Sequence, residues 1–249
     1  HLSIRRQRQM CIRDSPHPLE YPEMVTVSEG CGGLPKVCVT TPWSTAEIYP
    51  HGAHVTRFQK IGEEPLLFMS ESSEFKSGTA IRGGIPIIFP WFGGRDGHPA
   101  HGFARTAEWE FTDRSILADG SVELCFRLPE TGNLEAIYRV IVGESLSSEL
   151  EVRNAGDGEV LIENCLHTYF QIADIDSVSI HGLTDSTYLD KLSSEILSET
   201  ADSIRIASEV DRATYGVLPA VNSLDALKTR RGQKDVTFTS VGYGLQQVR

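Results

Sequence analysis

Apolar residues recur at every second position in many short runs of this sequence, which is the spacing of half-buried β-strands. The run Val122-Glu123-Leu124-Cys125-Phe126 is one example, and the Asp119-Gly120 pair before it is typical of a hairpin turn that follows Ile116-Leu117. No long segment has the apolar spacing of a helix. We therefore predict an all-β fold, a large antiparallel β-sandwich of about 230 residues. Further strands are predicted at 37–40, 46–49, 138–142, 150–153, 160–170, 178–180, 204–206 and 236–238.

The two ends of the sequence depart from this pattern. Residues 1–15 contain four arginines and one aspartate without any apolar period, so we interpret them as a non-native or disordered tail. Residues 25–249 are then expected to form a single domain. The last predicted strand lies near the end of the sequence, and we expect the sandwich to be truncated at the C-terminus.

The composition narrows the classes of function. A formal net charge of −11 at pH 7 disfavours binding to nucleic acid or to an anionic membrane surface. No apolar run approaches the roughly 18 residues that span a bilayer, and no N-terminal run has the apolar centre of a signal peptide. We therefore expect a cytoplasmic protein, taken to be a monomer, whose partner is a small molecule rather than nucleic acid or a membrane.

Motifs of metal-dependent and nucleotide-dependent enzymes are missing from the sequence. The five cysteines are scattered without metal-ligand spacing, and there is no phosphate-binding glycine loop, zinc-protease motif or serine-hydrolase motif. We therefore expect no metal and no cofactor. Cys165 lies two residues before His167 and is a nucleophile only if both side chains enter one pocket, so a small core residue is the favoured interpretation.

Two arginines, Arg82 and Arg105, lie in segments rich in glycine, proline and aromatic residues. Paired guanidinium groups can grip an anionic oxygen cluster such as a phosphate, and glycine lets the backbone approach a ligand closely. The alternative is that each arginine forms an ordinary surface ion pair. The residues alone leave both interpretations open.

A second segment places His167 between Leu166 and the aromatic residues Tyr169 and Phe170. Apolar neighbours desolvate the imidazole and favour its neutral form, which would tune an acid/base group near neutral pH. An isolated histidine on a strand is, however, more often a hydrogen-bonded core residue. His167 is therefore a candidate catalytic residue with a structural alternative.

Other polar residues are candidates for contacts with sugar hydroxyl groups. His101 precedes a glycine that permits close approach, whereas His98 is better interpreted as a loop histidine. Asp190 and Asp211 are either turn residues or acceptors of hydrogen bonds from hydroxyl groups.

Five motifs follow one another along the chain: Arg82-Gly83-Gly84-Ile85-Pro86 with Phe89-Pro90, His101-Gly102-Phe103-Ala104-Arg105, Leu166-His167-Thr168-Tyr169-Phe170, Tyr188-Leu189-Asp190-Lys191 and Asp211-Arg212. Taken in this order, they make the chain resemble the glucose-6-phosphate 1-epimerase family, the hexose-6-phosphate mutarotases related to aldose 1-epimerase. The resemblance runs from about Val25 to about Phe238.

This resemblance implies a galactose-mutarotase-like β-sandwich that interconverts the α and β anomers of a hexose 6-phosphate without cofactor or metal. It implies that His167 is the general acid and that a carboxylate is the base. Arg82, Arg105 and Asp211 match substrate-binding residues of the family, and His101 remains our candidate for a further contact with the sugar.

Two family features are absent from the sequence. Ala100 stands where the family usually has glutamine, and the family's late catalytic Glu, beyond a Trp-Asn-Pro motif, has no counterpart after Glu209. We therefore expect the parent gene to encode an epimerase and this polypeptide alone to be inactive or nearly so. The alternatives are a neutral-hexose aldose 1-epimerase and a non-catalytic carbohydrate-binding pseudoenzyme.

Overall fold

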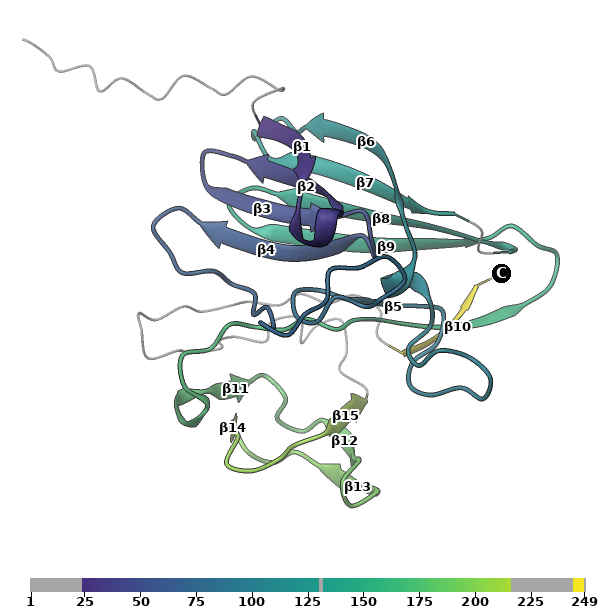
Figure 1. The fold of residues 1–249 in the computed structure, drawn as a ribbon. Helices are drawn as coiled ribbons and strands as arrows, with labels where there is room; N and C mark the ends of the chain where they lie inside the picture. Colours follow the sequence, from purple (N-terminus) through teal and green to yellow (C-terminus); the bar gives the residue numbers. More distant parts are fainter. Residues whose placement is uncertain (1–23, 130–131, 216–243, 249) are drawn as a thin grey trace, which may run out of the picture.

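The structure is a computed structural model that describes residues 24–129, 132–215 and 244–248. Within these ranges the regular structure consists of β-strands and short 3₁₀ turns (Figure 1), which confirms the predicted all-β class. None of the helices in the described part has the length or apolar character needed to cross a membrane. The tail at 1–15 and the strand expected at 236–238 lie outside the described residues.

The strands are numbered in chain order. They are β1 (Val25–Glu29), β2 (Pro35–Thr40), β3 (Ser44–Tyr49), β4 (His54–Lys60), β5 (Ile87–Ile88), β6 (Glu110–Ile116), β7 (Val122–Leu128), β8 (Leu134–Val142), β9 (Leu146–Asn154), β10 (Val160–Leu166), β11 (Ser179–His181), β12 (Thr187–Asp190), β13 (Glu195–Ser198), β14 (Ser203–Arg205), β15 (Arg212–Tyr215) and β16 (Gly244–Val248). The 3₁₀ turns are η1 (Cys31–Gly33), η2 (Ala104–Thr106) and η3 (Ile175–Ser177).

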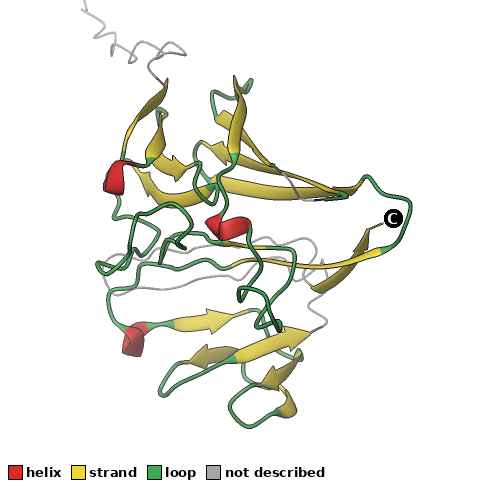
Figure 2. Ribbon diagram, turned by 45° about the vertical axis from the view of Figure 1, so that its right-hand side comes forward, coloured by secondary structure: helices red, strands yellow, loops and turns green. Residues whose placement is uncertain are grey.

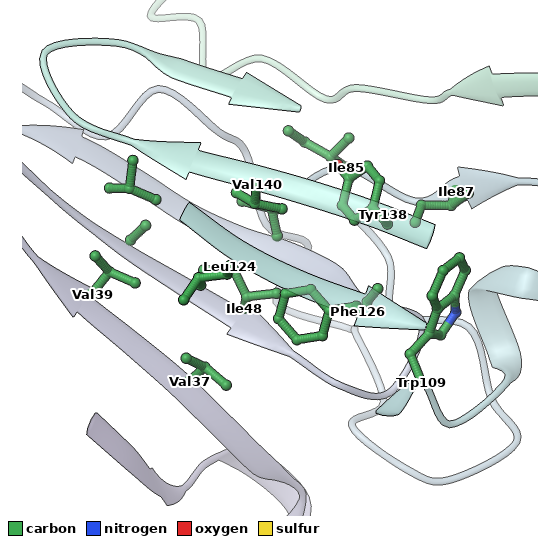
Figure 3. Packing of buried hydrophobic residues seen from close by; sticks show 14 of the residues in the cluster. Val37, Val39, Ile48, Ile85, Ile87, Trp109, Leu124, Phe126, Tyr138 and Val140 are labelled. Carbon is green, nitrogen blue, oxygen red and sulfur yellow. The ribbon is translucent and has the colours of Figure 1, made fainter. Parts of the chain in front are cut away.

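Two four-stranded antiparallel sheets, β1-β2-β3-β4 and β6-β7-β8-β9, form the two layers of the sandwich (Figures 1 and 2). Side chains alternate between the two faces of a strand, so one face of each sheet is buried. In β8, every second residue from Leu134 to Val142 is buried, and the residues between them are more accessible. Each fully buried aliphatic side chain contributes about 2 kcal/mol of transfer free energy. The core joins side chains of β2 and β3 to those of β7 and β8 (Figure 3), among them Val37, Val39, Ile48, Leu124, Phe126, Tyr138 and Val140.

The predicted hairpins are present. Ile116 pairs with Val122 across the Asp119-Gly120 turn, and β8 pairs with β9 along its whole length. The strand predicted over 160–170 is wrong beyond Leu166, where β10 ends. Beyond Leu166 the backbone continues along the segment that holds β5, since the His167 N–H donates to the Pro86 carbonyl at 3.0 Å and the Tyr169 N–H donates to the Gly84 carbonyl at 2.9 Å. The regular ladder ends here because Pro86 has no N–H to donate in return.

Smaller sheets extend the fold away from the sandwich. β10 pairs with β5 and β16, while β12 pairs with both β13 and β15 (Figure 1). The register of β12 and β15 places Asp190 opposite Arg212. The residues just outside these two strands, Lys191 and Asp211, therefore lie side by side at one edge of this small sheet.

Candidate active site

The three motifs that carry Arg82, His101 and His167 lie next to one another in the structure. The Pro86 carbonyl accepts the hydrogen bond from His167, and Phe89 forms a parallel bridge with Gly102. The first motif therefore runs between the other two. Residues far apart in sequence are thereby brought to one site through backbone contacts, without depending on long side chains to reach it.

Gly102 makes the contact between two of these motifs possible. Its φ of 70° lies in the left-handed region, and a Cβ atom there would lie 1.9 Å from the Phe89 carbonyl oxygen. No side chain fits that position without movement of the backbone. Glycine at 102 is thus required by the close approach of the two chain segments.

We expect Gly102→Ala to lower the free energy of unfolding by about 3 kcal/mol, from left-handed strain plus the clash with Phe89. The matched control is Gly94→Ala, because Gly94 is exposed and has open space where a Cβ would stand. That control should change stability by less than about 0.5 kcal/mol. Urea denaturation of both variants measures the difference, and equal midpoints would contradict the role of Gly102.

His101 is held in a defined orientation by the loop before it. Its backbone N–H donates to the Gly93 carbonyl at 2.7 Å, and its ring Nδ1 accepts a hydrogen bond from the Gly93 N–H at 3.1 Å. A neutral ring that accepts at Nδ1 carries its proton on Nε2. His101 can therefore present a hydrogen-bond donor to an oxygen atom of a ligand.

The two histidines predicted from sequence lie close together. The ring centroids of His101 and His167 are 6.2 Å apart, with an angle of 21° between the ring planes. Tyr169 packs edge-on against His167 at 5.1 Å, and Phe92 packs edge-on against His101 at 5.0 Å. An aromatic ring therefore flanks each imidazole, and His167 is nevertheless exposed to solvent.

Arg105 lies beside both imidazoles, and Arg82 lies near Arg105. Burial, together with the neighbouring charge of Arg82, lowers the pKa of Arg105 below its ordinary value. One Nη2–H of Arg105 donates to the Ala100 carbonyl at 2.9 Å, which orients the guanidinium group. Neither arginine forms an ion pair with a carboxylate of the described residues. The surface ion pairs that were the alternative for both arginines are therefore not seen in the described part of the chain.

Lys191 is a third cation at the site that the sequence analysis did not single out. Its Nζ lies 3.3 Å from Asp211 Oδ1 and 5.2 Å from the ring centroid of Phe92. Asp211 thus reaches the site through an ion pair with Lys191. Asp190 instead accepts a hydrogen bond from the Leu192 N–H at 2.9 Å, as a turn residue does. The Asp190-Lys191 motif was the available signal, but only its aspartate was considered.

Both imidazoles are shifted toward their neutral forms. Desolvation is the largest cause of the lowered pKa of His167, followed by the charges of Arg105 and Lys191. Desolvation also lowers the pKa of His101, followed by the charges of Arg105, His167 and Lys191. The free site therefore combines positive charges with two uncharged rings at pH 7, an arrangement suited to an anionic ligand.

We expect Arg105→Ala to raise the pKa of His167 toward its ordinary value, because Arg105 is the larger of the two cationic contributions. Titration of the His167 ring protons by NMR measures the shift. Arg95→Ala is the matched control, since Arg95 is exposed and stacks on Trp91 instead. An unchanged pKa in Arg105→Ala would show that the arginine does not act on this ring.

Neither cysteine chemistry nor a metal centre is built into this site. Burial raises the pKa of the Cys165 thiol, which is the opposite of what an activated nucleophile needs. Across the described ranges, no group of three His, Cys, Asp or Glu side chains is arranged to hold a metal ion.

Comparisons with known proteins identify the class to which this β-sandwich, with its site of histidines and arginines, belongs. A family model described as aldose 1-epimerase matches residues 35–225. The chain therefore belongs to the aldose 1-epimerase family. A solved structure from Salmonella typhimurium, described as a "putative mutarotase", matches with a TM-score of 0.70 and 29% identity over 78% of this chain and 67% of that chain.

Two curated relatives share the name "Putative glucose-6-phosphate 1-epimerase". The one from Escherichia coli (strain K12) is 38% identical over 171 residues, which cover 64% of this chain and 55% of the relative. The one from Cenchrus ciliaris is 36% identical over 217 residues, which cover 80% of this chain and 64% of the relative. The chain thus spans less than two thirds of the length of either relative.

A more distant structure supports the fold alone. A galactose mutarotase-like protein from Clostridium acetobutylicum matches with a TM-score of 0.57 at 15% identity, over 71% of this chain and 65% of that chain. This likeness confirms the expected galactose-mutarotase-like sandwich.

Proposed function

We propose that this site interconverts the α and β anomers of a hexose 6-phosphate, with glucose 6-phosphate as the substrate. The observation that carries the proposal is the position of Arg105, which lies beside two imidazoles of lowered pKa and has Arg82 near it, while neither arginine forms an ion pair with a described carboxylate. A neutral sugar offers only uncharged oxygen atoms to guanidinium groups, whereas a phosphate accepts stronger hydrogen bonds between opposite charges from both arginines. The names of the curated relatives support the same substrate.

The reaction needs an acid and a base at one sugar ring. The His167 ring donates a proton to the ring oxygen while a carboxylate removes the proton of the anomeric hydroxyl group, and the C1–O5 bond breaks. The open aldehyde rotates about its C1–C2 bond. Closure reverses both proton transfers and yields the other anomer, so that acid and base return to their starting states.

The phosphate group has a second role in this proposal. The free site holds His167 neutral partly through the charges of Arg105 and Lys191. A bound phosphate dianion opposes those charges and so favours the protonated imidazole. Substrate binding thereby prepares His167 to donate its proton at neutral pH.

The family's catalytic base, a late glutamate, has no counterpart in this sequence, since no glutamate follows Glu209. We therefore expect slow anomer exchange by these 249 residues alone. A small carboxylate such as formate, supplied in the buffer, should accelerate it by acting as the base. Ala100, which stands where the family usually has glutamine, favours one second candidate, a carbohydrate-binding module without catalysis.

Calorimetric titration with glucose 6-phosphate and with glucose tests the proposal. We expect the phosphorylated sugar to bind at least about tenfold more tightly, because each hydrogen bond to a charged group is worth about 2 kcal/mol. Equal affinities would point to a neutral-hexose epimerase, and binding of neither sugar would overturn the proposal. Anomer exchange measured by NMR in formate buffer separates an epimerase from a binding module.

A further inference from the structure

The turn between β3 and β4 contacts the chain segments of both site arginines. The Gly52 N–H donates to the Ala107 carbonyl at 2.7 Å, and a Cβ atom on Gly52 would lie 2.8 Å from the Arg105 carbonyl oxygen. On the other side, the Ile85 N–H donates to the Val55 carbonyl at 2.9 Å. One short stretch of the sandwich therefore supports both segments at once.

His54 makes the most deeply buried of these contacts. Its side chain is fully buried, and Nε2 lies 2.7 Å from the carbonyl oxygen of Gly83, the residue that follows Arg82. A carbonyl accepts only, so Nε2 carries the proton. Desolvation lowers the pKa of His54 to about 4, which keeps the ring neutral at pH 7.

The other ring nitrogen shows what histidine contributes at this position. Nδ1 of His54 is buried and has no hydrogen-bond partner among the described residues. A buried polar atom without a partner is unfavourable, and an apolar side chain would avoid that cost. The bond from Nε2 to Gly83 is thus the contribution that an apolar residue could not make.

The backbone at Gly83 needs such support. Its φ of 107° is reached by glycine and rarely by other residues, and a Cβ there would lie 2.5 Å from the Phe68 carbonyl oxygen. Arg82 itself is exposed, and its N–H donates to the hydroxyl group of Ser73 at 2.9 Å. The contact with His54 ties this exposed arginine to the core of the sandwich.

We infer that His54 is a positioning residue, which fixes the backbone next to Arg82 so that Arg82 and Arg105 close on the same phosphate group. The inference rests on the proposed function for the identity of the ligand. It does not depend on catalysis. His54 neither touches the substrate nor transfers a proton; it acts through Gly83.

Two substitutions at His54 test this role. His54→Leu removes the donor, whereas His54→Gln places an amide nitrogen the same number of bonds from Cα as Nε2. We expect His54→Leu to speed amide hydrogen exchange at residues 83–85 and to raise the Kd of inorganic phosphate, each by about tenfold. His54→Gln should restore both to within about threefold of the original protein, and glucose affinity should not change in either variant.

Exchange at the amides of β7 and β8 reports on the fold as a whole and should be unchanged. Unaltered phosphate affinity in His54→Leu, or absence of phosphate binding in the original protein, would overturn the inference. Equal losses of phosphate and glucose binding, without rescue by glutamine, would show a structural role only.

If His54→Leu does not fold, His54→Asn, whose amide reaches one bond less far, replaces it in the comparison with His54→Gln. If the proposed epimerase activity is wrong, neither the original protein nor its His54 variants will accelerate anomer exchange. Phosphate binding and hydrogen exchange would still decide the role of His54.

Discussion

Replacing Arg105 with alanine is expected to weaken the binding of glucose 6-phosphate by about a hundredfold, since the phosphate loses charge-assisted hydrogen bonds worth about 3 kcal/mol. The Ala100 carbonyl holds one Nη2–H of Arg105, so the guanidinium group is already oriented before a ligand binds. The substitution should leave little strain behind, because Ala100 is exposed and water can solvate its carbonyl group. Calorimetric titration of the variant measures the loss directly.

Three comparisons make the Arg105 experiment specific. Arg105→Lys keeps the charge but loses the planar fork, so its affinity should fall between those of the original protein and the alanine variant. Arg95→Ala removes an exposed arginine that stacks on Trp91, and it should bind glucose 6-phosphate normally. Glucose, which lacks the phosphate, should bind all of these proteins with the same affinity. An Arg105→Ala protein that retains the original affinity for glucose 6-phosphate would remove the basis for a phosphate-binding site.

Replacing His167 with glutamine is expected to slow anomer exchange of glucose 6-phosphate by about a hundredfold in formate buffer. Glutamine is similar in size and keeps a hydrogen-bond donor, but it cannot transfer a proton at neutral pH. The ring of His167 is accessible, flanked by Tyr169 and close to His101, so the change should not disturb the core. Exchange spectroscopy between the two anomeric protons gives the rate, after subtraction of the rate in formate without protein.

The matched control for His167 is His98→Gln. His98 is exposed in the loop before His101, and its ring packs against Trp91 at a centroid distance of 5.3 Å. Its replacement should leave the exchange rate unchanged. If the His167 variant keeps most of its rate, the general acid lies elsewhere, and His101 becomes the residue to replace next.

The strands that were predicted most directly from sequence have one buried and one accessible face. β7, β8 and the hairpin at Asp119-Gly120 depend on alternation and turn chemistry, which act over a few residues and can be seen in the sequence. β4 was missed because it begins with three buried residues in succession, His54, Val55 and Thr56. Val55 packs in the core, while His54 bonds to the Arg82 segment, so alternation disappears where one strand serves both sides.

The residues of the site also divide into those that local sequence features predict and those that only contacts in space bring to the site. Residue types and their glycine, proline or aromatic neighbours indicated Arg82, Arg105, His101 and His167 as candidates, because these are local features of the sequence. Lys191 was not predicted as a site residue, because its position beside both imidazoles depends on the pairing of β12 with β15 and on the position of Phe92. The positioning role that we infer for His54 could not be foreseen either, because its partner is a backbone carbonyl far along the chain.

By itself, the sequence determined the all-β class, the main hairpins and the residue types available for acid/base chemistry and phosphate binding. Only the tertiary structure decided that Arg105 and Lys191 lie close enough to His101 and His167 to lower the pKa of both rings, with Arg82 near Arg105. The physical reason is the range of the interactions. Alternation and turns depend on neighbours in sequence, whereas desolvation and the electric field of a cation depend on distance in space.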